Sequence, residues 1–157
     1  MKQSPRDKKL EEMLRSTRLV AGGFMGTDPR HPVEVIEHDL AVLEDLGVTT
    51  GQLAQYMREL TELAKPRLGT WIDDTFGKLR VKSEDFKGVL VCPWPHPGFY
   101  EKRITTAEHL RTGKQISWTD LNIHMIEEHG FFEGKGAFFR IEPKEIVDIL
   151  FEDLTPE

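Results

Sequence analysis

Four side chains of types that bind transition metals occur at short spacings in the second half of the chain. The only cysteine, Cys92, lies four residues before His96, and His124 lies five residues before His129. This pattern, C-x3-H followed by H-x4-H, provides one thiolate and three imidazoles, a donor set that suits a tetrahedral zinc ion. We therefore predict that the four residues bind one metal ion, with zinc as the expected cofactor.

The residues between Cys92 and His96 favour a chain path that would keep these two candidate ligands apart unless the chain turns back. Prolines alternate with Trp94 and His96 after Cys92, and they favour an extended path. Four residues in a polyproline-like path span about 12 Å, which is too far for two ligands of one ion. Cys92 and His96 can bind one ion only if the segment folds back, and a cis peptide bond at Trp94-Pro95 within a tight turn would produce such a fold.

The second pair of candidate ligands lies on a predicted helix that carries Leu121, Ile123, Met125 and Ile126. On such a helix the directions of His124 and His129 differ by about 140°. We therefore expect the helix to fray at Glu128, just before Gly130, a residue suited to a left-handed helix end. Ser117 or Thr119 is expected to cap its beginning.

Two further residues are candidates for the same site. Glu128 shares a helix face with His124, and His109 lies in a polar segment, where we expect an isolated histidine to be exposed. Either residue would be an additional ligand or a group that transfers protons. If no metal binds, Cys92 is a small buried residue or forms a thiol-imidazole pair with His124, and His129 is a cation at a helix end.

The remaining pattern predicts an α+β fold, in which an N-terminal helical hairpin packs on a C-terminal half made of a small antiparallel sheet and helices. The expected helices begin at Pro5, Val33, Thr49 or Thr50, and Pro143, and the expected strands cover 78–82, 89–91, 99–104, 131–132 and 137–141. A change in character near Gly77 divides the chain into a mainly helical segment, 1–77, and an α+β segment, 78–157. The two segments form either separate units or one compact domain.

Composition narrows the classes of partner. Charged residues make up 31% of the chain, hydrophobic residues make up 38%, and the formal net charge is -6. These values are typical of a soluble globular protein, and the negative charge argues against general binding to nucleic acid. The chain has one cysteine, no signal-peptide pattern and no apolar run of about 20 residues, so we expect a cytoplasmic protein without a membrane partner.

Three functions remain open from the sequence. In the first, the metal is structural and the protein is a binding or interaction module. In the second, the protein is a metal-dependent or cysteine-dependent hydrolase. In the third, the join between the helices at Val33 and Thr50 resembles the turn of a helix-turn-helix DNA reader, although acidic side chains on both helices would repel phosphate. The phenylalanines at 131–132 and 138–139 are expected in the core, and any exposed part of them would mark a homo-oligomer surface.

Overall fold

The computed structural model describes residues 4–17, 20, 22–74, 77–96 and 98–152. Within these residues the fold is α+β, as predicted, with five α-helices and a four-stranded antiparallel sheet. The elements are α1 (Pro5–Arg15), α2 (Pro32–Asp45), α3 (Thr50–Ala64), the 3-10 helix η1 (Lys65–Arg67), β1 (Ile72–Asp73), β2 (Leu79–Val91), β3 (Phe99–His109), β4 (Gln115–Thr119), α4 (Asp120–His129) and α5 (Pro143–Phe151). None of the described helices is long and apolar enough to cross a membrane.

Strands β2 and β3 are the longest elements of the sheet, and the loop that joins them carries two of the candidate ligands. The strand order is β1-β2-β3-β4, and the β2-β3 register runs from the pair Leu79 and His109 to the pair Val91 and Phe99. The prediction of two short strands separated by a turn at 83–88 is wrong. The polar residues there continue the strand, and a bulge between Asp85 and Val89 absorbs the irregularity.

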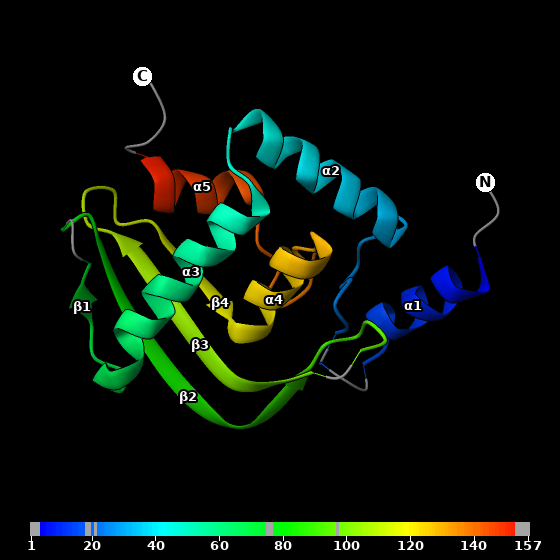
Figure 1. Ribbon diagram of the computed structural model, residues 1–157, viewed down its shortest axis with the longest axis horizontal. Coiled ribbons are helices and arrows are strands. Elements are labelled where there is room, and N and C mark those ends of the chain that lie inside the picture. Colours follow the sequence, from blue (N-terminus) through cyan, green and yellow to red (C-terminus); the bar gives the residue numbers. More distant parts are fainter. Residues whose placement is uncertain (1–3, 18–19, 21, 75–76, 97, 153–157) are drawn as a thin grey trace.

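The helices lie on one side of the strongly curved sheet, and α3 runs across β2 and β3 (Figure 1). Beneath α3 lies the main hydrophobic core, in which Trp118 and Phe132 are fully buried. The indole N–H of Trp118 donates a 2.9 Å hydrogen bond to the hydroxyl of Thr61, which in turn donates to the carbonyl of Met57. Burial of this large side chain therefore leaves no unpaired indole donor.

A second core lies beneath the loop between β2 and β3. Its buried members come from α1, the segment before α2, α2, the loop, α4 and the segment after α4: Leu14, Phe24, Met25, Val35, Cys92, Leu121, Met125 and Phe131. Through Leu14, this core holds the N-terminal helix near the tip of the β2-β3 hairpin (Figure 1). Both cores contain residues from before and after Gly77, and the division of the chain at that residue stays a prediction.

The segment after α4 does not form the strands predicted at 131–132 and 137–141. One hydrogen bond, from the N–H of Ile141 to the carbonyl of Phe132, links the two runs, but the segment is irregular. It packs instead against residues 24–27, where the N–H of Gly134 donates to the carbonyl of Phe24 at 2.8 Å. A side chain at Gly26 or Gly134 would place its Cβ under 3.0 Å from backbone atoms of the other segment. These glycines therefore permit close backbone packing.

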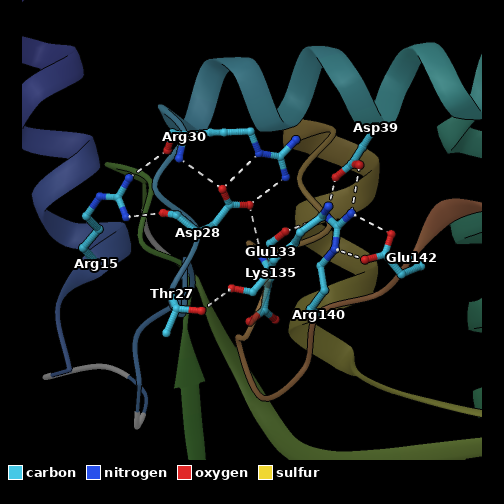
Figure 2. A network of polar contacts seen from close by, with 9 residues as sticks. All are labelled: Arg15, Thr27, Asp28, Arg30, Asp39, Glu133, Lys135, Arg140 and Glu142. Atoms are coloured by element: carbon cyan, nitrogen blue, oxygen red, sulfur yellow. Dashed lines mark hydrogen bonds and ion pairs between the residues drawn. The ribbon is translucent and has the colours of Figure 1, made fainter.

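Polar side chains fasten the same two segments to α1 and α2 (Figure 2). The carboxylate of Asp28 accepts hydrogen bonds from the side chain of Arg30 and from the backbone N–H of Lys135. The pKa of Asp28 is held well below its ordinary value, chiefly by its hydrogen bonds with the Arg30 side chain. The guanidinium of Arg15 donates to the carbonyls of Asp28 and Arg30 at 2.7 Å each. The end of α1 is thus tied to the segment that leads into α2.

Glu133 is a buried carboxyl group beside this network. The Nδ2 group of Asn122 donates a 2.8 Å hydrogen bond to its Oε2, and its backbone carbonyl accepts from Arg140 at 2.7 Å. Burial raises the pKa of Glu133 to about 8, although the hydrogen bond from Asn122 and the charge of Arg140 oppose the increase. The folded protein therefore holds a proton here that the unfolded chain loses near pH 4.5.

We expect Glu133 to contribute a loss of stability as the pH rises from about 5 to about 8, because only the folded state holds the Glu133 proton in that range. Glu133→Gln keeps the neutral shape, so its urea midpoint should change less with pH and should exceed that of the wild type at about pH 8.5. The measurement is urea unfolding of both proteins at several pH values. Glu37→Gln, at an exposed site, is the matched control. Equal pH dependence of Glu133→Gln and the wild type would contradict the prediction.

Candidate metal centre

The first pair of candidate ligands is brought together by a turn with trans peptide bonds. Cys92 directly follows β2 and is buried. The N–H of His96 donates a 2.8 Å hydrogen bond to the carbonyl of Trp94, which closes a three-residue turn around Pro95. Among the described residues there is no cis peptide bond, so the chain folds back, but not through the cis bond at Trp94-Pro95 that the sequence suggested. The fixed φ of proline suits the central position of such a turn, which reverses the chain without isomerisation.

The second pair of candidate ligands lies on α4. Thr119 caps this helix, and Asn122 completes a reciprocal capping box. The helix continues through His129 and ends at Gly130, whose φ is 63°. The expected fraying at Glu128 is therefore wrong. His124 and His129 leave the helix in different directions. Their Nε2 atoms nevertheless converge on the ring of His96, whose Nε2 atom lies within 3.1 Å of both.

Three of the distances between the ligand atoms are close to the edges of a coordination tetrahedron. The Nε2 atom of His96 lies 3.1 Å from the Nε2 atoms of both His124 and His129, and the Sγ atom of Cys92 lies 3.6 Å from the Nε2 atom of His129. All four ligand atoms lie within 4.8 Å of one another. Zn–N and Zn–S bonds of about 2.05 and 2.3 Å would require edges of about 3.3 and 3.6 Å. The four residues therefore lie close enough to bind one metal ion.

Burial sets the protonation of these groups. It lowers the pKa of His129 to about 4, with smaller contributions from the charges of His124 and His96. Burial, and then the charge of His96, also lowers the pKa of His124. Burial raises the pKa of the Cys92 thiol. At neutral pH the rings of His124 and His129 are therefore neutral and ready to bind a metal, whereas the thiol must release its proton when it becomes a ligand.

Aromatic side chains flank two of the ligand rings. The indole of Trp94 stacks on the imidazole of His129, with 4.0 Å between ring centroids and an angle of 5° between the planes. The ring of Tyr100, on β3, stacks on His124 at 4.8 Å and 29°. The sequence analysis did not assign either residue to the site. The one feature of the sequence that could have indicated a role for Trp94 is its position between the two candidate ligands in Cys-Pro-Trp-Pro-His.

The structure places the two additional candidates outside the four-residue cluster. His109 is the last residue of β3, at the opposite end of that strand from the loop between β2 and β3, here called the metal loop. The Nε2 atom of His109 lies 2.8 Å from a carboxylate oxygen of Glu152. It is buried, so the expectation of a solvent-exposed histidine is also wrong. Glu128 is exposed on α4 and does not belong to the cluster.

A small pocket of about 250 Å³ adjoins the cluster through His124, and Tyr100, which stacks on His124, also lines it. Its other lining residues come from α3 and α4: Arg58, Thr61, Glu62, Asp120, Ile123 and Glu127. Arg58 and Glu127 form an ion pair of 2.8 Å across the pocket lining. The volume of this pocket is slightly below the roughly 300–1,000 Å³ of most small-molecule sites.

Comparison with known proteins gives no relative: no family model, no curated protein and no solved structure matches the chain.

Proposed function

We propose that the protein binds one zinc ion through Cys92, His96, His124 and His129, and that this closed centre stabilises a small binding module. The observation that carries the proposal is the close approach of one sulfur and three imidazole ligand atoms, all within 4.8 Å of one another. Zinc suits a set of one thiolate and three imidazoles, and a site with four protein ligands leaves no position for a substrate. A structural role is the one that such a closed site supports.

The place of the ligands in the fold supports a structural role. Cys92 and His96 lie in the loop that joins β2 and β3, whereas the other two ligands lie on α4. An ion bound by all four would fasten the tip of the hairpin to the helix. The loop contains three prolines and lies outside the regular hydrogen bonding of the sheet, so the metal would supply the restraint that backbone pairing does not.

The hairpin near this loop offers a surface for a partner. Phe86, Val89 and Phe99 are 47, 57 and 75% exposed, and all three lie on the part of β2 and β3 that neither β1 nor β4 covers. Of the phenylalanines considered from the sequence, Phe131 is fully buried and Phe138 is 80% exposed. Exposed apolar side chains beside a rigid loop favour a role in protein interaction, and a second copy of the chain is one such partner.

The test is elemental analysis of tag-free protein, with cobalt(II) substitution as a probe of geometry. We expect about one zinc per chain, and a cobalt-loaded protein with the visible absorption of a tetrahedral thiolate site. His124→Ala should lose most of the bound metal because it removes one of four ligands. His38→Ala, at an exposed histidine of α2, should keep it. Wild-type protein without metal, or His124→Ala with unchanged metal content, would refute the proposal.

A second candidate function rests on the pocket beside His124. If only three of the residues bind the metal, the fourth position can hold a water molecule that faces this pocket, and a hydrolytic reaction becomes feasible. A cobalt spectrum that indicates a water ligand would favour this candidate over the closed site. For the DNA-reading alternative, α3 would be the recognition helix, but it packs across the sheet and pairs its Arg58 with Glu127 of α4, so this helix is engaged within the fold.

A further inference from the structure

Trp94 and Tyr100 each stack on the imidazole ring of one candidate ligand, Trp94 on His129 and Tyr100 on His124. Metal-bound histidines are ordinarily oriented by a hydrogen bond from the second ring nitrogen to a carboxylate or a carbonyl group. In the part of the chain that the structure describes, the hydrogen-bond-range contacts of His124 and His129 run through Nε2, toward the other ligands. The stacked rings are therefore the contacts that restrict the rotation of these imidazoles.

The stack on His129 is the closer of the two. The planes of the indole and the imidazole are nearly parallel, with an angle of 5° between them. Trp94 has proline on both sides, which limits its backbone, and its ring packs edge-on against Phe131 at 5.4 Å. Trp94 also packs against the second core. An indole held in this way restricts the imidazole plane to one orientation, with Nε2 directed toward His96 and Cys92.

The stack on His124 has a separate support. Tyr100 belongs to β3, where its backbone pairs with Leu90 of β2, and its ring also packs against the second core. The two ligands of α4 are thus oriented from outside the helix, one by the metal loop and one by the sheet. This arrangement explains how ligands whose directions diverge on a helix converge on one point.

We propose that Trp94 and Tyr100 are positioning residues for the metal, which hold the rings of His129 and His124 in the ligating orientation before the ion arrives. This inference rests on the proposed zinc site, and it adds a physical contribution to the affinity of that site for the metal. Restriction of ligand rings before binding reduces the entropy lost on binding, so affinity rises without a further bond to the metal. Substitution of residues that orient metal ligands typically weakens metal affinity by about 10- to 100-fold.

The test compares metal affinity, by competition with a chromogenic chelator, for Trp94→Leu, Trp94→Phe and the wild type. We expect Trp94→Leu to bind zinc about 10-fold more weakly and to give an altered cobalt(II) spectrum. Trp94→Phe, which keeps an aromatic face, should restore most of the affinity. The matched control is Trp71→Leu, because Trp71 lies under Arg80 at the other end of β2, with the guanidinium carbon 4.2 Å from the ring centroid. This control should bind zinc like the wild type.

Two results separate the failure of this inference from the failure of the zinc site. If the wild type binds zinc but Trp94→Leu keeps its affinity and cobalt spectrum, the stacking role is wrong and the site stands. If the wild type binds no metal, both proposals are wrong. Should Trp94→Leu fail to fold, Tyr100→Leu provides the same comparison at His124, where unchanged affinity and spectrum would equally overturn the inference.

Discussion

Removal of the metal is expected to lower the melting temperature and to release α1 from the second core. Cys92 is both a ligand and a buried member of that core, and Trp94 packs against it while stacked on His129. Without the ion, the loop that carries both residues loses its link to α4. Because Leu14 holds α1 in the same core, the helix should detach when this core loosens.

The size of the effect follows from linkage between binding and folding. Free metal at about 1,000 times its dissociation constant stabilises the folded state by about 4 kcal/mol. For a chain of this size that corresponds to a fall in melting temperature of about 10 °C on chelation. The measurements are thermal unfolding with and without a strong chelator, and tryptic cleavage at Lys8 and Lys9 of α1 under both conditions.

Cys92→Ser supplies the control for these experiments. It should resemble the chelated wild type, and chelator should cause no further change in it. Slow cleavage of α1 and an unchanged melting temperature after verified metal removal would show that the ion does not support the second core.

Arg140→Met is expected to destabilise the protein by about 3–5 kcal/mol, the usual cost of leaving one partner of a buried ion pair alone. The two terminal guanidinium nitrogens of Arg140 donate to the carboxylate of Asp39, a residue that is only 1% exposed (Figure 2). Arg140 also donates to the carbonyl of Glu133 and to the carboxylate of Glu142. The substitution would leave the charge of Asp39 buried without its principal partner.

A double-mutant cycle tests this explanation. Asp39→Asn combined with Arg140→Met removes both charges, so it should cost less than the sum of the two single substitutions in urea unfolding. Lys82→Met is the comparison at the partly exposed pair of Lys82 and Glu84, where less than about 1 kcal/mol is expected. A loss below about 1 kcal/mol for Arg140→Met would contradict a stabilising role of the buried pair.

The sequence by itself determined the donor set and most helix boundaries, because these depend on residue type and on local spacing. Cys92 and the three histidines could be chosen for their chemistry, and the structure brings them together. Helix ends are local too: Ser4 caps α1, Thr119 caps α4, and Gly130 ends α4 in the left-handed region, as the residues predicted.

Only the tertiary structure decided which segments meet. The apolar run from Ala137 to Ile141 has the pattern of a strand, yet its neighbourhood packs against residues 24–27, which include Gly26 and lie more than a hundred positions earlier. The polar neighbours of His109 in the sequence predicted an exposed side chain. In the structure His109 is buried and contacts Glu152, which is distant in the sequence. The stacking of Trp94 on His129 likewise joins a loop to a helix end. Hydrophobic periodicity reports which side of an element is buried, whereas the partner that buries it depends on packing between residues far apart in the chain.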